Sequence, residues 1–543
     1  MLASCATKQP DPPPSLPAAV PPAAVAVEPA APPVTRPTRV FFGDTHLHTG
    51  MSLDAGIAGA RLMPADAYRF AKGEAVTSAS GQQTKLSRPL DFLVVADHSD
   101  QMGFISDLIA GKPELLKNPK AKQWYDLMQA GKPQEAALDL IATFSQGKFP
   151  QEIAYVPGTP GYGSAWQTTI KAAEEANAPG RFTAFIGYEW TSLVSGNNLH
   201  RNIIFRDNAD RASQVEPYTN YAPGSSDPVG LWNWMAAYEK KTGGQVLAIA
   251  HNGNLSNGMM FPMIESFKGK PMDRDYVETR AKRERLYEVT QMKGDGEAHP
   301  YLSPNDEFAA FEIWDKGNLD MSEKKRPAML EFEYARSALK NGLKLESQFG
   351  TNPYKFGLVG STDSHTGLTT ADDNNYWGKL ATSEPSPKRA MHPFLKTAKG
   401  TILSWEEVAS GYAAVWATEN TRESLFDAMQ RKEVYATTGP RMTVRFFGGW
   451  EFAASDAQGD VASAGYAKGV PMGGDLKAAP AGKAPTFLVA AMKDPEGGNL
   501  DRIQVIKGWL DGEGALHEQI YDVVWSGDRK PEDGKLPPVG NTV

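Results

Sequence analysis

The stretch "TRVFFGDTHLHTG" (38–50) joins a short apolar run to two histidines at its end. The β-branched and aromatic residues of this run favour a buried β-strand. Side chains two residues apart in a strand point to the same face, so His46 and His48 present two imidazoles together. Such a pair is either incidental or the beginning of a metal site, and the rest of the chain bears on which interpretation holds.

The composition of the whole chain narrows the classes of function. The chain has 543 residues, 41% of them hydrophobic, which indicates a globular protein with two or three domains or one large barrel. The net charge of −8 and the lack of a basic stripe make nucleic acid a poor candidate for a partner. The sequence contains no apolar run of about 18 residues, the length that a membrane-spanning helix needs. The single cysteine, Cys5, leaves His, Asp and Glu as the residues that could bind a metal.

The first 37 residues differ in composition from the rest. Leu2-Ala3-Ser4-Cys5 is similar to the lipobox of a bacterial lipoprotein, although the charged and apolar regions of a signal peptide do not precede it. Residues 9–37 are dominated by Pro and Ala, which is typical of an extended linker. We therefore expect residues 1–37 to be a leader and linker. A lipid on Cys5 would tether the protein to a membrane, in the bacterial periplasm or at the outer membrane. The alternative is a generic disordered N-terminus.

Short β-branched or aromatic runs that end in polar residues recur along the chain, and most are separated by segments of helical character. This alternation predicts an α/β fold with a largely parallel sheet. Runs such as "FLVVA" fit strands that are covered on both faces. Segments 102–180 and 253–307 are too long for simple crossovers and are expected to be insertions, the second carrying a charged helix. The predicted strands lie in 38–46, 90–98, 181–190, 200–207, 244–252, 308–318 and 356–365.

Histidines and carboxylates gather where these runs end. In α/β folds the chemistry collects at the carboxyl ends of the strands, whereas incidental histidines would scatter. Imidazole and carboxylate together are ligands for zinc, manganese or iron. Asp97, and with less support Asp44, fits a residue that orients a ligand. The residues at the ends of runs are His46, His48, His98, Glu189, His251, Asp363 and His365, whereas His299, His392 and His517 are expected on the surface or in loops.

The composition changes again near residue 441. Alternating runs separated by Gly- and Asp-rich turns predict a β-rich C-terminal region over 441–543. The chain stops at "VGNTV" with no evident closing element, so we expect this region to be truncated.

Five motifs together resemble the PHP (polymerase and histidinol phosphatase) superfamily: "DTHLHTG", "VVADHSD", "IGYEWTS", "IAHNG" and "STDSHTG". With "YATTGPR" added, the set resembles a bacterial branch known only as a domain of unknown function, DUF3604. The resemblance covers about residues 39–440 and implies a PHP-like hydrolase domain over 38–440. It implies a distorted seven-stranded (β/α) barrel with helical insertions, holding two or three divalent ions of zinc, manganese or iron.

The resemblance also implies which residues would bind the ions. His200 precedes its apolar run, so it must lie on a loop or on a strand that runs the other way. Asp54 lies in a Gly-rich turn, where Asp is common for other reasons, and each of the other residues could instead be a hydrogen-bonded polar group of the core. The implied sets are His46, His48, Glu189 and Asp363 for a first ion; Glu189, His200 and His251 for a second; and Asp54, His98 and His365 for a third.

The hypothesis for function is hydrolysis of a small-molecule phosphoester, or of a sulfate ester, by a hydroxide that bridges two ions. The candidate catalytic residues are Asp363, His365 and Arg201, with Lys316 and Arg441 as further cations that could neutralise developing charge. The sequence does not reveal the general acid, the substrate, the identity of the metal or the oligomeric state.

Two other classes of function stay open. An amidohydrolase-like enzyme acting on esters or lactones also begins with an HxH motif on a barrel strand. It would usually need a bridging lysine where this chain has Glu189. A non-catalytic envelope protein could keep the metal site without turnover.

Overall fold

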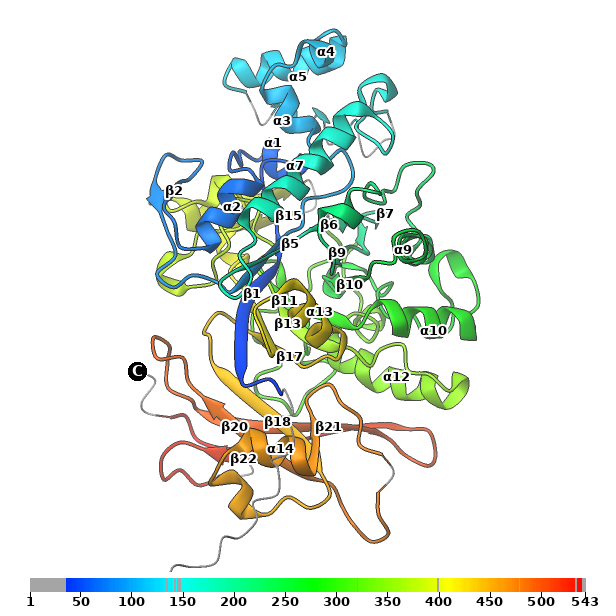
Figure 1. The fold of residues 1–543 in the computed structure, drawn as a ribbon, viewed down its shortest axis with the longest axis vertical. Coiled ribbons are helices and arrows are strands. Elements are labelled where there is room, and N and C mark those ends of the chain that lie inside the picture. Colours follow the sequence, from blue (N-terminus) through cyan, green and yellow to red (C-terminus); the bar gives the residue numbers. More distant parts are fainter. Residues whose placement is uncertain are drawn as a thin grey trace, which may run out of the picture. The chain divides into compact units, whose positions relative to one another are not determined.

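The structure is a computed structural model that describes residues 36–539, except 133, 134, 138, 141, 142, 144–147, 320, 398, 399, 478, 533 and 534. The predicted lipobox at Cys5 and nearly all of the Pro/Ala-rich linker lie outside the described residues. The described residues from Pro37 onward form one compact unit, shown in Figure 1. None of the helices in the described part has the length and apolar character of a membrane span.

The opening stretch forms strand β1 (Arg39–Leu47), which lies at the centre of a five-stranded sheet. The order of this first sheet is β17-β16-β1-β4-β5. Strands β1, β4 and β5 run parallel, whereas β16 pairs antiparallel to both β1 and β17. The other bounds are β4 (Phe92–Val95), β5 (Thr183–Phe185), β16 (Tyr412–Ala417) and β17 (Val434–Thr437).

A second sheet has the order β12-β11-β10-β9-β6, and β13 also pairs with β11. Strands β10, β11 and β13 are parallel, but β9 is antiparallel to both of its neighbours. The largely parallel sheet that we expected from the sequence is therefore mixed. The bounds are β6 (Gly187–Trp190), β9 (Arg201–Phe205), β10 (Val246–His251), β11 (Leu286–Gln291), β12 (Gly294–Asp295) and β13 (Gly357–Gly360).

The two sheets approach each other at two places. Strands β5 and β6 are separated by one residue, and an isolated parallel bridge joins His98 to Glu189 beside them. A second isolated bridge joins Leu47, at the end of β1, to Ser364 after β13. Among the described residues these bridges do not complete a ladder, so the structure is a mixed α/β protein and does not confirm a closed seven-stranded barrel.

Four strands of the two main sheets, β11, β12, β16 and β17, were not predicted, and one prediction was wrong. The run 308–318 forms turns and isolated bridges, and Phe308 and Phe311 are exposed. The longest unpredicted strand of the second sheet is β11, whose sequence follows directly on the charged helix α10 (Arg274–Arg283). The charged residues of α10 concealed the short apolar alternation of β11. Strand β16 was also overlooked.

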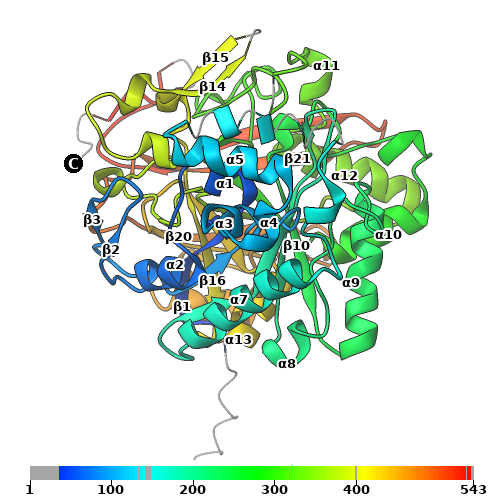
Figure 2. The same ribbon diagram turned by 90° about the horizontal axis from the view of Figure 1, so that it is seen from above.

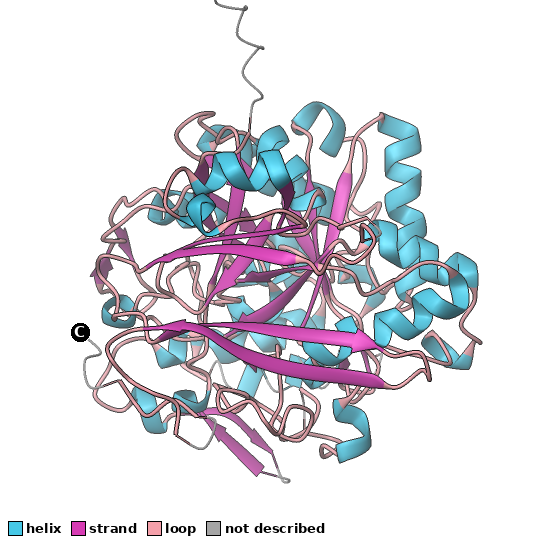
Figure 3. Cartoon of the chain, turned by 90° about the horizontal axis from the view of Figure 1, so that it is seen from below, coloured by secondary structure: helices cyan, strands magenta, loops and turns pink. Residues whose placement is uncertain are grey.

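The strands are covered on both faces, as their continuous apolar sequences predicted. Phe92 and Val94 of β4 share a core with residues of β10, β11, β13, β16 and helix α13 (Arg422–Gln430). Leu93 and Val95, which point the other way, pack in the core that includes α2 (Pro64–Ala71), α7 (Pro160–Ala176) and α9 (Pro228–Thr242). Figure 3 shows the strands gathered with helices around them. On the far side of the second sheet, α12 (Ala335–Phe349) belongs to a third core cluster.

The segment 102–180 is a helical insertion, as predicted. Helix α3 (Phe104–Ile109) contacts α1 (Leu53–Ile57), α4 (Pro113–Leu116) and α5 (Pro119–Gln129), and Figure 2 shows these helices next to one another. Short strand pairs lie outside the two main sheets: β2 (Val76–Thr77) with β3 (Gln83–Thr84), β7 (Leu193–Val194) with β8 (Asn197–Asn198), and β14 (Pro393–Thr397) with β15 (Gly400–Leu403).

The region after residue 440 is rich in strands. Strand β18 (Thr443–Gly449) pairs with β19 (Gly469–Pro471) and β20 (Thr486–Met492), and α14 (Val461–Lys468) packs on them. Strands β21 (Arg502–Leu510) and β22 (Leu516–Trp525) form a separate antiparallel hairpin. The Arg445 guanidinium lies 3.2 Å above the ring of Trp416, which anchors β18 to β16.

Candidate metal centre

The structure brings together all nine residues that the resemblance named as metal ligands. They come from the end of β1, the segment after β4, β6, the residue before β9, the end of β10, the segment after β13, and α1. All are buried except His98 and Asp54, whose side chains are 12% and 46% exposed. Residues that are up to about 300 positions apart in the chain therefore meet in one cluster. The nine are His46, His48, Asp54, His98, Glu189, His200, His251, Asp363 and His365.

The carboxylate of Glu189 lies at the centre of this cluster. Its Oε1 is 2.7 Å from His200 Nδ1 and 2.7 Å from His251 Nε2. Its Oε2 is 2.5 Å from His98 Nδ1. His46 and His48 are also within 4 Å. One buried carboxylate that faces five imidazoles is in a position to be shared between two ions.

Asp363 occupies the side of the cluster next to the two histidines of β1. Its Oδ1 is 3.4 Å from His46 Nε2, 3.3 Å from His48 Nε2 and 3.1 Å from His365 Nε2. The backbone of Asp363 has a positive φ of 50°, and so does that of Asn252, the residue after His251. Non-glycine residues adopt this conformation at a cost, which proteins tend to accept where a functional side chain must be aimed.

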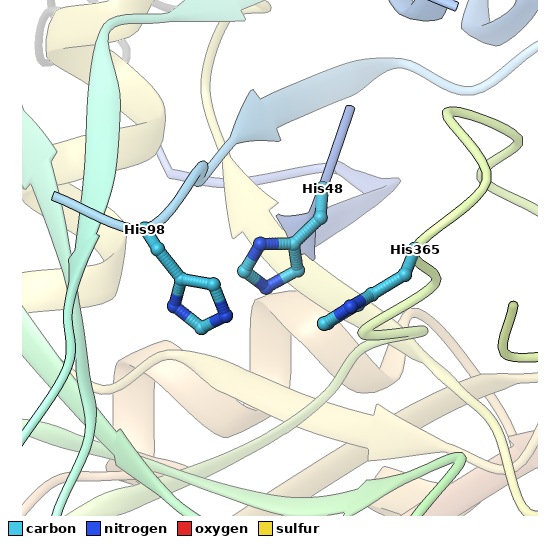
Figure 4. A group of neighbouring side chains, drawn as sticks. All are labelled: His48, His98 and His365. Atoms are coloured by element: carbon cyan, nitrogen blue, oxygen red, sulfur yellow. The ribbon is translucent and has the colours of Figure 1, made fainter. Parts of the chain in front are cut away.

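His48, His98 and His365 form a further group (Figure 4), with their rings pointing toward one another. Their ligand atoms lie within 4.8 Å of one another. Asp54 Oδ2 is 3.3 Å from His98 Nε2 and 3.2 Å from His365 Nδ1. Because Asp54 is the only half-exposed member of the nine, this group marks the side of the cluster that faces solvent.

The position of His200 follows from the reversed strand. Strand β9 runs antiparallel to β6 and β10, so the residue that precedes it lies beside the carboxyl ends of its neighbours. His200 therefore meets Glu189 and His251, and of the two alternatives that the sequence left open, a loop or a reversed strand, the structure has the reversed strand.

The chemistry of the donor atoms fits divalent ions. Burial lowers the pKa of His46 and His48 well below the ordinary value, and lowers that of His200 to about 3 and of His251 to about 4. These imidazoles are neutral at pH 7 and offer a lone pair. His200 Nε2 and His251 Nδ1 are buried with no hydrogen-bond partner among the described residues. Buried unpaired nitrogens of this kind are costly unless a ligand satisfies them.

His98 differs from the other histidines of the cluster. Burial opposes its charged form, but the carboxylates of Glu189 and Asp54 outweigh burial and raise its pKa to about 10. Burial would also raise the pKa of Glu189, yet the neighbouring histidines, with His98 the strongest, hold it well below the usual range. In the metal-free protein, a proton on His98 thus compensates part of the negative charge.

Residues behind the cluster orient it, and one of them was not predicted. Glu288 of β11 accepts a hydrogen bond from His46 Nδ1, at 3.1 and 3.2 Å, which aims Nε2 of that ring at the cluster. Asp97 accepts from Ser52 Oγ, which lies 2.8 Å from His48 Nδ1, so Asp97 acts on His48 through Ser52. Asp44 binds the hydroxyl of Thr362 and holds the segment before Asp363. The alternation in "LYEVTQ" was the available signal for Glu288.

A known protein family matches this chain over nearly its whole length. A family described as "Protein of unknown function (DUF3604)" matches residues 35–543. The chain belongs to the DUF3604 family. A search of curated proteins found no match. A matching solved structure, from Bacteroides vulgatus, is described as a two-domain protein containing a predicted PHP-like metal-dependent phosphoesterase. The two proteins share 8% sequence identity, and their alignment covers 89% of this chain and 95% of the Bacteroides vulgatus chain. The TM-score is 0.29, a likeness too low to support a statement about this chain.

In this DUF3604 protein, Arg201 does not face the cluster. Its Nε is 2.9 Å from Glu284 Oε1, a carboxylate that also binds Trp232 and Arg280, and all of these groups are buried. His200 and Arg201 are neighbours in an extended segment, so their side chains point to opposite faces. The prediction that Arg201 is catalytic is therefore corrected: its charge is used in a buried ion pair.

The two other predicted cations also lie elsewhere. Lys316 pairs with Glu406, and Arg441 donates to the backbone carbonyls of Arg88 and Pro89. The histidines expected outside the cluster are indeed outside it, although His299 is buried and bonded to Asp315.

The cations that do reach the cluster in this family member are Lys293 and Lys379. Lys379 Nζ is 2.6 Å from Asp363 Oδ1, and Lys293 Nζ contacts Asp363 Oδ2. Gln291 Nε2 donates to the same Oδ2 at 2.5 Å. Both lysines are buried, and burial lowers the pKa of Lys379 to about 8. Neither lysine lies in a motif that the sequence singled out, so no sequence signal pointed to them.

Proposed function

We propose that this DUF3604 protein is a metal-dependent hydrolase that cleaves phosphoester, or sulfate-ester, bonds of a small molecule. The observation that carries the proposal is the arrangement of Glu189, a buried carboxylate within 4 Å of five histidines. Buried carboxylates of this kind are usually paired with a cation, and here only His98 among the imidazoles is protonated without metal, so bound ions would supply the rest. The donor set is the one that zinc, manganese and iron prefer.

Three sets of residues would hold the ions. His46, His48 and Asp363 would hold a first with Glu189; His200 and His251 would share Glu189 with a second; and His98, His365 and Asp54 would hold a third. When bound, such ions lower the pKa of a water molecule and neutralise charge on phosphoryl oxygens. We further propose that the two sheets form the distorted barrel typical of PHP enzymes.

The residues of the chain supply orientation and access. Glu288 fixes the tautomer and direction of His46, and the pair Asp97 and Ser52 does the same for His48. The buried side of the cluster excludes water, which strengthens electrostatic interactions there. Substrate would approach from the side of Asp54, the half-exposed residue.

A metal analysis combined with a substrate panel tests the proposal. The purified protein is assayed for bound metal and for hydrolysis of 4-nitrophenyl phosphate, bis(4-nitrophenyl) phosphate, 4-nitrophenyl sulfate and a lactone. Asp363→Asn and His46→Ala should each lose metal and activity together. His392→Ala, at an exposed histidine outside the cluster, is the matched control and should match the wild type.

The outcomes separate the rival functions. Activity on phosphate or sulfate esters that disappears in both variants supports the proposal. Activity on the lactone or on carboxylic esters alone favours an amidohydrolase-like enzyme. Bound metal without turnover of any substrate favours a metal-binding protein of the cell envelope. Variants that keep full activity would show that the cluster is not the active site.

A further inference from the structure

Lys293 and Lys379 place two lysine amino groups on one carboxylate. Lys293 comes from the turn between β11 and β12, and Lys379 from the segment whose backbone pairs with His365. Both contact Asp363, one on each carboxylate oxygen, and both are less than 10% exposed. One cation is enough to neutralise one carboxylate. A second buried ammonium beside the first is costly, and burial together with the neighbouring Lys379 lowers the pKa of Lys293 well below its ordinary value.

Glu407, at the end of the turn Ser404–Glu406, is an acidic residue close enough to both lysines to feel their charge. Its side chain is buried, and neither carboxylate oxygen has a hydrogen-bond partner among the described residues. Burial raises the pKa of Glu407 to about 8, and the charges of Lys293 and Lys379 oppose that shift. At pH 7 Glu407 is therefore mostly neutral, and Asp363 is the anion that pairs with Lys379.

The oxygen that Lys379 contacts is the one that faces the histidines. Asp363 Oδ1 lies 3.1 to 3.4 Å from His46, His48 and His365, and 2.6 Å from Lys379 Nζ. If Asp363 Oδ1 also bound an ion, its negative charge would stabilise the Lys379 ammonium less. Lys379 would then be a buried cation beside the cluster without a full anionic partner. Lys293, on Oδ2 with Gln291, holds the other side of the carboxylate in place.

We propose that Lys379, positioned with Lys293 and Asp363, binds a non-bridging oxyanion of the substrate and so selects phosphate and sulfate esters over neutral esters. This inference rests on the proposed function and deepens it by naming the charge of the substrate. A buried ammonium donates a charge-assisted hydrogen bond to an anionic ester and so stabilises its binding. With a neutral ester the buried cation keeps no anionic partner, which disfavours binding. Lys379 is the residue that touches substrate, and Lys293 is a positioning residue.

The test uses the metal-loaded protein and substrates with one leaving group. 4-Nitrophenyl phosphate, bis(4-nitrophenyl) phosphate and 4-nitrophenyl sulfate are compared with the neutral 4-nitrophenyl acetate. Lys379→Met should lower kcat/KM for the anionic esters by about 100-fold, the usual loss for one oxyanion donor, and change that for the acetate by less than about 3-fold. Lys379→Arg should recover a large part of the loss. Lys316→Met, which removes a lysine paired with Glu406, is the matched control.

A binding measurement makes the test independent of turnover. Inorganic phosphate is titrated into the wild type and Lys379→Met by calorimetry, with metal content measured in both. We expect unchanged metal content and phosphate affinity weakened by about 10-fold or more. Lys379→Gln serves as a second neutral variant should Lys379→Met fold poorly.

The two proposals fail in different ways. Unchanged phosphate affinity in both neutral variants, or an equal loss of activity on the acetate and the anionic esters, would overturn the role of Lys379. If the wild type hydrolyses no ester and yet its phosphate affinity depends on Lys379, the oxyanion site stands and the proposed function falls.

Discussion

Replacing Arg201 with Met tests whether this arginine stabilises the fold or acts in catalysis. The side chain is 1% exposed, and its guanidinium donates to Glu284 and to the backbone carbonyl of Leu199. Methionine fills much of the same space without the charge. We expect Arg201→Met to lower the free energy of unfolding and to leave kcat/KM of the folded protein within about 3-fold of the wild type.

The size of the loss follows from the partners that Glu284 keeps. Removing one member of a buried ion pair costs about 3–5 kcal/mol, because the remaining charge is left uncompensated. Here Arg280 remains 3.1 Å from Glu284 Oε2, and Trp232 Nε1 remains 3.1 Å from Oε1. The carboxylate thus keeps two of its three partners, so we expect about 3 kcal/mol, the lower end of that range.

The assay is urea unfolding followed by far-ultraviolet circular dichroism, with kcat/KM measured in parallel on the ester panel. The double variant Arg201→Met with Glu284→Gln also removes the carboxylate that pairs with the buried Arg280, so it should lower the free energy of unfolding further than Arg201→Met alone. A stable Arg201→Met protein whose kcat falls by about 100-fold, the usual loss of one transition-state contact, would refute the structural role and restore a catalytic one.

Three further predictions concern the cluster itself. Chelation of the metal should lower the free energy of unfolding by about 2.7 kcal/mol if the ion had been present at about 100 times its Kd, and adding the ion back should restore it, as followed by urea unfolding. Glu288→Gln should weaken metal binding by about 10–100-fold in a competition titration, because the ring of His46 loses its anionic partner; unchanged affinity would mean that Glu288 does not tune the site. The pKa of His98, about 10, keeps this imidazole protonated at pH 7 in the metal-free protein, and a ligand must be neutral. Metal binding by the wild type should therefore release about one proton more than binding by His98→Gln, and calorimetry in two buffers that shows equal release would contradict this assignment.

Most of the cluster could be predicted because strand geometry is local. A strand that ends in His-x-His presents both rings to one face, whatever the rest of the chain does. The same reasoning placed His98, Glu189 and His251 at strand ends, and it left a loop or a reversed strand as the alternatives for His200. Strand β11 was not predicted because its apolar alternation is short and adjoins a charged helix. The run 308–318 was wrongly predicted as a strand because its aromatic residues resemble those of a buried strand.

The sequence by itself determined which histidines and carboxylates face one way at the ends of strands, and hence the composition of the candidate metal centre. Only the tertiary structure decided their partners. Glu288 reaches His46 across 242 residues, and Lys293 reaches Asp363 across 70, because the order of strands in the sheets brings those segments together. It also assigned Arg201 to Glu284 rather than to the cluster. Side-chain direction follows from local backbone periodicity, but the choice of partner depends on contacts between distant segments, which no local pattern encodes.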